Sequence, residues 1–279
     1  RNTSLLEGWA PVDFQLMVDT QRPDEPVLVG PGDGEVNVPG SPNLEVGVSD
    51  PQGDTLDVTF YGRQVSGTAD FTIVVLPDTQ GYSAFADNAQ IFTAQTQWIV
   101  DNLSSRNIIF VSHEGDIVED ANSTIQWDRA RESMSVLDPG LWNLSDLNLP
   151  DPLIPYGVLP GNHDQPTVPP SGFYNLYFPY THYESRGLPW YGDHYPGTGN
   201  DNSYQFFSAG GDDYVIVHIC YDPNADTIMW ADQALKAYPR RKAIVVTHAL
   251  IDTDGDLLDE GEAVWNDLVL GNDNVHFVL

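Results

Sequence analysis

Four short apolar runs, each followed at once by small or polar residues, place the strongest constraint on how this chain folds. The runs end immediately before Pro77, His113, Pro160 and Thr247, and segments with helical spacing of apolar residues lie among them. Continuous apolar strands of this kind are typical of sheets that are buried on both faces. Strands that alternate with helices predict an α/β fold, with the polar residues gathered beyond the carboxyl ends of the strands.

This alternation extends across residues 68–279, which we expect to form one domain. A segment rich in Pro, Gly and aromatic residues interrupts it at 165–202. In chain order the pattern predicts strands at 71–76, 108–112, 156–159, 203–208, 214–219, 243–247 and 275–279, and helices at 87–104, 124–137, 226–238 and 261–269.

The N-terminal part of the chain has a different composition. From residue 27 to about residue 65, short alternating stretches are bounded by Pro-Gly, Ser-Pro and Gly-Asp turns, which is typical of β-strands. We predict a small β-sandwich module at 21–67, preceded at 1–20 by the tail of another segment. The module resembles the Ig-like or fibronectin-III-like modules of bacterial surface and secreted proteins, although it is short for a complete one. The resemblance implies a spacer or adhesion module, suited to surface attachment or self-association.

The charge of the chain excludes one class of partner. Eleven basic residues against 41 acidic ones give a net charge of −30, which argues against binding nucleic acid or an anionic membrane through bulk charge. A small phosphate-bearing ligand stays open, because a bound cation inverts the local field. The single cysteine, Cys220, excludes a cysteine-based zinc cluster. No apolar run approaches the length of a transmembrane helix.

Several features favour an exported protein. The chain begins with Arg1 and shows no signal-peptide pattern, so we expect a mature or excised piece of a longer protein. Four Asn-x-Ser/Thr sequons, few lysines and many aspartates suit an extracellular surface. We therefore predict a secreted or cell-surface protein of bacterial or archaeal origin.

The polar residues at the strand ends indicate a paired-metal site. Two divalent cations about 3.5–4 Å apart need a bridging carboxylate, with oxygen and nitrogen donors on each side. Asp116 suits the bridge, because the neighbouring Gly115 lets the backbone approach closely. Asn162 and His248 would complete one metal, and Asp78 would begin the other.

The most specific of these motifs is Gly-Asn-His-Asp at 161–164, because four small or polar residues after an apolar strand serve no packing purpose. His163 can donate a proton to a leaving oxygen, and Asp164 can fix the tautomer of that histidine. Each residue alone also has an ordinary explanation. An Asp after a strand often caps a helix or forms a turn, and a lone His is often structural.

Taken together, the motifs resemble those of the calcineurin-like metallophosphoesterase family over about residues 70–279. The resemblance implies a four-layer α/β/β/α sandwich and two divalent or trivalent metal ions, such as Mn, Fe or Zn. The motifs that carry it are Asp78-x-Gln80, Gly115-Asp116-x-x-x-Asp120, Gly161-Asn162-His163-Asp164 and Thr247-His248. It implies Asp78 on the first metal, Asp116 as the bridge, Asn162 and His248 on the second metal, His163 as acid or transition-state stabiliser, and Asp164 as its partner.

The chain departs from the family pattern in two places. Gln80 stands where the family usually has a histidine; its amide oxygen would still coordinate, as a harder and weaker donor. The family also closes its site with a Gly-His-x-His segment after a late strand. Here 275–279 is predicted to be that strand and His276 lies within it, so we expect the enzyme domain to be truncated before that segment.

Other candidates are less specific. The aromatic-rich stretch 173–195 is either a substrate-lining lid or a loop packed as its own small core. Within it, Tyr191 and His194 are the candidate substrate-binding residues. Two acidic stretches, 50–54 and 252–259, partly resemble calcium loops, although both also suit solvated acidic turns.

The sequence therefore predicts a metal-dependent enzyme that hydrolyses a phosphate monoester or diester at a dinuclear site. An alternative is an extracellular surface or filament-forming structural protein that keeps the fold with an impaired site. A third hypothesis, an adhesion or carbohydrate-binding protein with structural calcium, predicts folding that depends on calcium without hydrolysis.

Overall fold

The computed structural model describes residues 70–165 and 171–279 continuously, and in the N-terminal part residues 24, 27–30, 45–51, 55–56 and 58. The chain divides into two compact units, Arg1–Gln64 and Val65–Leu279. In the first unit, strand β1 (Val27–Gly30) pairs antiparallel with β2 (Glu45–Gly47). The predicted tail at 1–20 and most of the module at 21–67 lie outside the described residues, so the β-sandwich stays a prediction.

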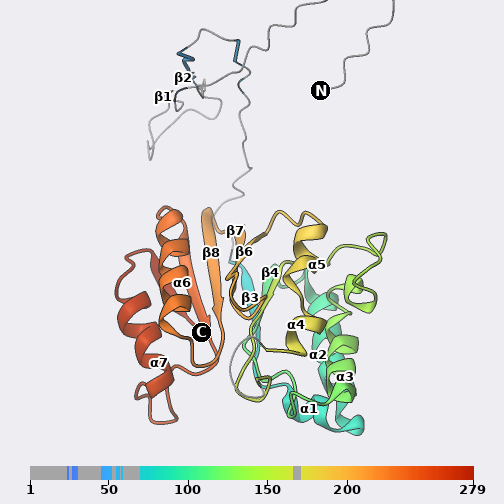
Figure 1. Ribbon diagram of the computed structural model, residues 1–279. Helices are drawn as coiled ribbons and strands as arrows, with labels where there is room; N and C mark the ends of the chain where they lie inside the picture. The colour runs from blue at the N-terminus through green and yellow to red at the C-terminus, as the bar shows by residue number, and fades with distance from the viewer. Residues whose placement is uncertain are drawn as a thin grey trace, which may run out of the picture. The chain divides into compact units, whose positions relative to one another are not determined.

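The second unit contains two β-sheets (Figure 1). One has three parallel strands in chain order, and the other has five strands in the order β10-β9-β8-β7-β6. The strands of the first sheet are β3 (Thr72–Leu76), β4 (Ile108–His113) and β5 (Tyr156–Val158). Those of the second are β6 (Tyr191–His194), β7 (Ser203–Ala209), β8 (Asp212–Ile219), β9 (Lys242–Thr247) and β10 (Val275–Val278).

Helices cover the outer face of each sheet, which gives four layers (Figure 1). The three-stranded sheet packs against α2 (Ala86–Asn102) and α3 (Thr124–Met134). The five-stranded sheet packs against α6 (Ala225–Ala237) and against α7 (Asp259–Ala263), which continues as a π-helical turn at Val264–Val269. The mixed α/β fold is confirmed, and its layers follow the predicted α/β/β/α order.

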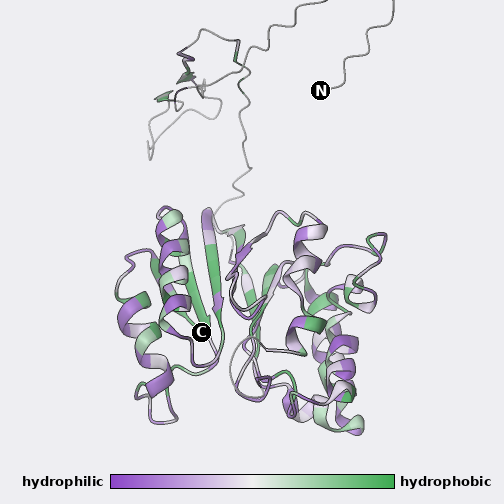
Figure 2. Cartoon of the chain, viewed as in Figure 1, coloured by the Kyte–Doolittle hydropathy of each residue, from purple (hydrophilic) through white to green (hydrophobic). Residues whose placement is uncertain are grey.

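A third apolar cluster fills the space between the two sheets. Phe110 of β4 meets Phe207 of β7 there, with ring centroids 5.3 Å apart. Figure 2 shows the same pattern as apolar strands inside and polar helix faces outside. The central strands β4, β5, β8 and β9 are therefore buried on both faces, as the continuous apolar strands predict, whereas the edge strand β10 is partly exposed.

The predicted segment at 165–202 contains regular elements that the sequence pattern did not indicate: α4 (Tyr174–Tyr177), α5 (Tyr180–Ser185) and β6. Aromatic packing holds them, since the rings of Tyr183 and Tyr191 stack with centroids 4.8 Å apart. The short helix α1 (Gln80–Ala84) and the 3-10 turn at Pro139–Trp142 also lay outside the predicted set.

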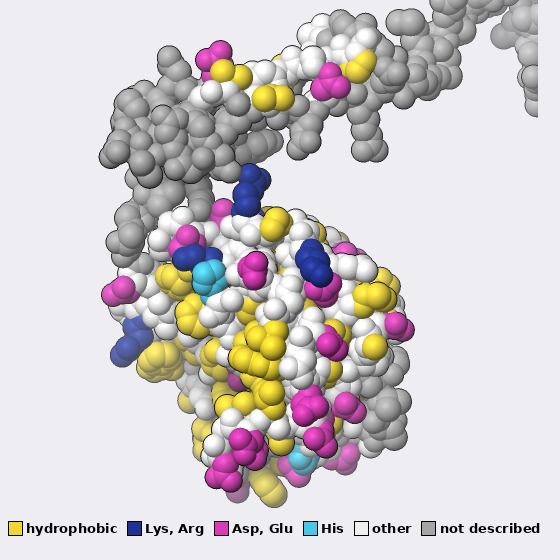
Figure 3. Space-filling model, turned by 90° about the vertical axis from the view of Figure 1, so that its left-hand side faces the viewer, with side chains coloured by type: hydrophobic (Ala, Val, Ile, Leu, Met, Phe, Trp, Pro, Cys, Tyr) yellow, Lys and Arg dark blue, Asp and Glu magenta, His cyan; other side chains and the backbone are white. Residues whose placement is uncertain are grey.

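The acidic charge is mostly a surface property. Among the described residues the buried acidic side chains are those of Asp116, Asp138, Asp164 and Asp201. On the side of the second unit that carries α6 and α7, acidic side chains are spread over the surface and basic ones are few (Figure 3). Within the described part of the chain, none of the helices combines the length and apolar character that crossing a membrane requires.

The topology brings the polar motifs to one place. Leu76, His113 and Val158 lie side by side at the carboxyl ends of β3, β4 and β5. In the other sheet, β9 runs parallel to β8 and ends beside it, with Thr247 opposite Ile219. A hydrogen bond between Ser112 Oγ and His218 Nε2, 3.0 Å long, joins the two sheets near this end.

Candidate metal centre

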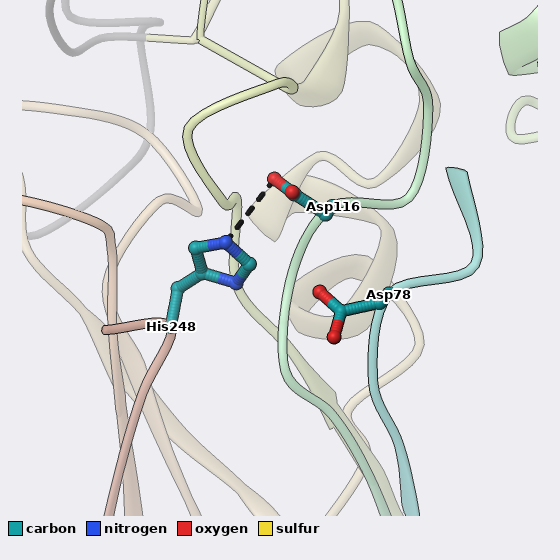
Figure 4. Close-up of side chains that lie close together, drawn as sticks. All are labelled: Asp78, Asp116 and His248. Carbon is teal, nitrogen blue, oxygen red and sulfur yellow. Dashed lines mark ion pairs between the residues drawn. The ribbon is translucent and has the colours of Figure 1, made fainter. Parts of the chain in front are cut away.

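Asp78, Asp116 and His248 lie together at this end of the sheets (Figure 4). One ligand atom of each lies within 4.8 Å of the others. Asp116 Oδ1 is 3.3 Å from His248 Nε2, and the Asp116 side chain is almost fully buried. The three residues follow β3, β4 and β9, so the site lies where loops from both sheets meet.

The backbone at both aspartates is strained. Asp78 has φ 52° and Asp116 has φ 49°, in the left-handed region that residues other than Gly rarely adopt. Such a conformation costs on the order of 1–3 kcal/mol and persists where the surrounding structure imposes it, commonly at functional sites. Here it turns two successive strand ends sharply, so that both carboxylates face the same space.

Two glycines let the loops approach closely. A Cβ added to Gly161 would lie 2.2 Å from Asp116 Oδ1, and one added to Gly115 would lie 2.5 Å from the Gly161 nitrogen. Gly115 also has φ +89°. No larger residue fits either position without moving the loops apart.

The contacts of His248 show that the group lacks positive charge. Its Nδ1 lies 2.8 Å from the Glu114 carbonyl oxygen, which only accepts, so Nδ1 carries the hydrogen. The other nitrogen, Nε2, faces Asn162 Oδ1 at 3.0 Å and Asp116 Oδ1 at 3.3 Å. A neutral Nε2 would thus add a third acceptor to two oxygens, an arrangement that a proton or a metal cation stabilises.

The pKa values around His248 point to the same need for positive charge. Burial lowers the pKa of His248, but its hydrogen bond to Asp116 and the charge of that carboxylate raise it to about 9. Burial and the nearby charge of Asp78 raise the pKa of Glu114 to about 7. Glu114 Oε1 is buried without a hydrogen-bond partner among the described residues.

Gln80, at the start of α1, reaches the same centre. Its Nε2 donates to Asp116 Oδ2 at 3.3 Å, while its Oε1 is buried and has no partner in the described part of the chain. Two carboxylates, two amide oxygens and an imidazole form a donor set of hard and borderline ligands, which suits Mn, Fe or Zn. The residues present therefore fit a metal ion.

His163 lies at the solvent side of the group. Its backbone nitrogen donates to Asp116 Oδ1 at 2.9 Å, and its ring Nδ1 lies 3.2 Å from the Glu119 carbonyl oxygen. The side chain is 37% exposed. Partial burial lowers the pKa of His163. The Glu119 carbonyl and the charge of Asp116 raise it by a larger amount, so the net shift is upward.

Asp164 has a different role from the predicted one. Its buried carboxylate accepts hydrogen bonds from the backbone nitrogens of Gly161, Ile117 and Val118, each about 2.9–3.0 Å long. Burial raises its pKa to about 7, although these three amides oppose the shift. The carbonyl of Glu119, rather than Asp164, lies beside the ring nitrogen of His163. Asp164 thus holds the two motif loops together instead of fixing the tautomer of His163.

Two supporting residues, Thr79 and His113, were missed by the sequence analysis. His113 Nε2 lies 3.0 Å from Thr79 Oγ1, and the Gly115 nitrogen donates to His113 Nδ1 at 3.3 Å. Burial lowers the pKa of His113 to about 3, so the ring is neutral and Nε2 is the donor to Thr79. This histidine joins the loops that carry Asp78 and Asp116. Its place at the end of a buried strand, directly before the Gly-Asp motif, was the available signal.

Comparison with known proteins identifies the fold family. The family model described as calcineurin-like phosphoesterase matches residues 71–279. The chain belongs to this family. It is also 35% identical over 211 residues to the uncharacterized protein YvnB of Bacillus subtilis (strain 168). That match covers 75% of this chain, which spans 15% of the length of YvnB.

Solved structures give weaker similarities to this chain. The purple acid phosphatase PPD1 from yellow lupin seeds superposes with a TM-score of 0.39 and 14% identity, over 64% of this chain and 30% of that one. GAP50, the anchor in the inner membrane complex of Plasmodium, superposes with a TM-score of 0.34 and 12% identity, over 71% and 60% of the two chains.

The structure does not bring the remaining predicted residues to the candidate metal centre. The Tyr191 hydroxyl donates to Asn200 Oδ1 at 2.8 Å, and its ring packs on Tyr183. His194 lies beside Glu184 on a different part of the domain. In the acidic stretch at 252–259, Asp252 Oδ1 accepts from the backbone nitrogens of Asp254 and Asp256, which makes it a tight turn. The stretch at 50–54 lies partly outside the described residues.

Proposed function

We propose that this domain hydrolyses phosphate esters with two metal ions bound at the candidate centre. The observation that carries the proposal is the position of His248 Nε2, which faces the oxygens of Asp116 and Asn162 at 3.3 Å and 3.0 Å. These three groups need positive charge between them, and a phosphoesterase family member has a use for metal ions there.

The donor set divides between two ions. Asp116 would bridge them, Asn162 and His248 would hold one, and Asp78 with the free Oε1 of Gln80 would hold the other. When bound, the ions would polarise the phosphoryl oxygens and lower the pKa of the attacking water. They would also offset the acidic surroundings, so that an anionic ester can approach.

His163 is the proposed proton donor. The Glu119 carbonyl accepts from Nδ1, which leaves Nε2 to carry the proton that moves to the leaving oxygen. Of the groups that raise the pKa of His163, the Glu119 carbonyl has the largest effect, and it favours the protonated ring. Its 37% exposure leaves it accessible to a substrate that arrives from solvent.

The biological setting is part of the proposal. Four sequons, the low lysine content and the net charge of −30 support an exported protein that acts outside the cell. Immunoblots of the culture medium, envelope and cytoplasm of cells that make the protein would test this. Protein confined to the cytoplasm would refute export but leave the chemistry untouched.

An alternative function has one observation in its favour. Gln80 presents its nitrogen to Asp116, and an amide is a weaker ligand than the usual histidine. An extracellular surface or filament-forming structural protein with an impaired metal site would have this arrangement. It would bind little metal and hydrolyse nothing, whereas the enzyme would do both.

One experiment separates the two functions. The chain is freed of metal with a chelator, reloaded with Mn, Fe or Zn, and assayed on p-nitrophenyl phosphate and bis-p-nitrophenyl phosphate. Metal content is measured on the same samples. We expect metal-dependent turnover, which Asp116→Asn should lose together with the metal of this centre. Asp101→Asn, a control at an exposed site on α2, should keep both. Absence of turnover, with the same metal content in the parent chain and in Asp116→Asn, would favour the structural protein.

A further inference from the structure

A second group of metal-ligand side chains lies outside the proposed catalytic centre. It consists of Glu184 in α5 with Asp193 and His194 in β6, and one ligand atom of each lies within 4.8 Å of the others. His194 Nδ1 is 3.5 Å from Glu184 Oε1 and 3.5 Å from Asp193 Oδ1. A histidine nitrogen thus faces two carboxylates from two different elements.

The orientation of the His194 ring is set by packing. The ring stacks on Tyr180 with centroids 3.7 Å apart and an interplanar angle of 17°, and the side chain is 12% exposed. Its Nδ1 is inaccessible to solvent and makes no hydrogen bond to any described residue. Burial lowers the pKa of His194, which favours a neutral ring with a lone pair available. A buried polar atom without a partner is destabilising, so a bound group that pairs with Nδ1 would stabilise the fold.

The distances suit a metal ion better than a hydrogen bond. A nitrogen-to-oxygen hydrogen bond is about 2.7–3.2 Å long, so 3.5 Å is too far for one. In a tetrahedral zinc site, with ligands about 2.0–2.1 Å from the metal, neighbouring ligand atoms lie about 3.3–3.4 Å apart. The observed separations therefore leave room for an ion between the three side chains.

The two carboxylates are held at the surface. Their side chains are 48% and 55% exposed, so an ion can enter from solvent and water can complete its coordination. Asp193 Oδ1 also accepts from the His194 backbone nitrogen at 2.8 Å, which turns the carboxylate toward the ring. The pairing of β6 with β7 shifts register between Tyr191 and Asp193, and such bulges redirect side chains.

This group is separate from the centre that contains His248. In the five-stranded sheet, β6 is the third strand from β9, the strand that leads to His248. With neighbouring strands about 4.8 Å apart, the two places are about 14 Å from each other. One ion cannot be shared between them.

We propose that Glu184, Asp193 and His194 form a separate site for one divalent transition-metal ion such as zinc, with water as the remaining ligand. The bound ion links α5 to β6. It therefore fixes the aromatic-rich segment between residues 171 and 202 and acts as a structural metal, independent of hydrolysis.

Zinc binding in a variant that lacks the other centre tests the proposal. In the double variant Asp116→Asn/His248→Ala, we expect one zinc ion per chain by elemental analysis after equilibration with zinc alone. We also expect zinc to raise the Tm and cobalt(II) to give the visible absorption of a tetrahedral site. Adding His194→Ala should abolish all three effects.

His194 also stacks on Tyr180, so His194→Ala removes a packing contact as well as a ligand. Variants that change only the charge of a side chain separate the two effects. In the same background, Glu184→Gln and Asp193→Asn should each weaken zinc binding by at least about 10-fold. Glu132→Gln, at an exposed position on α3, should leave zinc binding unchanged. The proposal is overturned if the double variant binds no zinc, or if zinc binding survives all three substitutions at the site.

Discussion

His248 Nε2 lies 3.3 Å from Asp116 Oδ1, although the two residues follow strands of different sheets. The Nδ1 atom of the same ring contacts the Glu114 carbonyl, so one histidine touches two positions of the loop after β4. The centre therefore lies at the junction of the two sheets, and a change in either sheet would move the ligands relative to each other.

Metal binding should stabilise the folded domain. Asp78, Asp116 and Glu114 bring acidic groups together, and burial with the nearby charge of Asp78 raises the pKa of Glu114 to about 7. A bound cation offsets these negative charges, so a chelator should lower the Tm and added Mn or Zn should restore it. Asp116→Asn should lower metal affinity at the centre by at least about 100-fold, because even outer partners of a metal contribute 10–100-fold.

Thermal unfolding with and without chelator measures this effect. The Asp116→Asn variant should respond to manganese far less than the parent chain. Its Tm in chelator should be no higher than that of the parent, since the substitution also removes the charge partner of His248. An equal response of both proteins to manganese would contradict the assignment of Asp116.

Stability should fall in acid because of His218. Burial lowers the pKa of His218 to about 3, whereas the ordinary value is 6.5. Below pH 6.5 the unfolded chain therefore binds a proton that the folded chain does not, and the free energy of unfolding falls as the pH decreases toward 3. Each pH unit in this window contributes about 1.4 kcal/mol for one such group.

Urea unfolding at several pH values between 4 and 7 isolates this contribution. His218→Gln offers Ser112 a hydrogen-bonding group without a titrating ring. The variant should be less stable than the parent at pH 7 but should lose less stability on acidification. Parallel curves for the two proteins would show that His218 titrates normally in the folded state.

The location of the centre could be predicted from the sequence, and its supporting contacts could not. Apolar strands followed by Asp78, Asp116, Asn162 and His248 specify a position at the carboxyl ends of a buried sheet, because parallel strands end at a common edge. That prediction needs only the order of residues along the chain.

The supporting contacts depend on distances that no local pattern encodes. Asp164 lies in the predicted motif, yet its partners are three backbone nitrogens, two of them more than forty residues away. Aspartate is among the residues enriched at positive φ, but no local pattern specifies which aspartates adopt it; Asp78 and Asp116 do so where the two loops meet. In the same way, α5 and β6 are stabilised by aromatic contacts rather than by periodic patterns.

His163→Ala should separate proton donation from metal binding. Loss of a positioned general acid typically lowers the rate by about 10²–10⁴-fold. Metal content should stay unchanged, since the contact of this residue with Asp116 is made by its backbone nitrogen. The loss of kcat should be large for an alkyl ester and small for a p-nitrophenyl ester, whose leaving group needs no proton. A similar loss for both esters would argue against His163 as the acid.

Gly161→Ala should weaken metal binding without removing any ligand. The added methyl group would lie 2.2 Å from Asp116 Oδ1 and 2.4 Å from the Asp116 nitrogen, and neither atom can move without shifting the loop after β4. Such overpacking costs about 1–3 kcal/mol of folding free energy. The displaced carboxylate should lower metal affinity by about 10-fold or more.

Gly172→Ala is the matched control, because a Cβ there meets nothing within 4 Å. Titration calorimetry with manganese should therefore show normal affinity for Gly172→Ala and weak affinity for Gly161→Ala. Equal affinities would mean that the close approach of the two loops is not what positions Asp116.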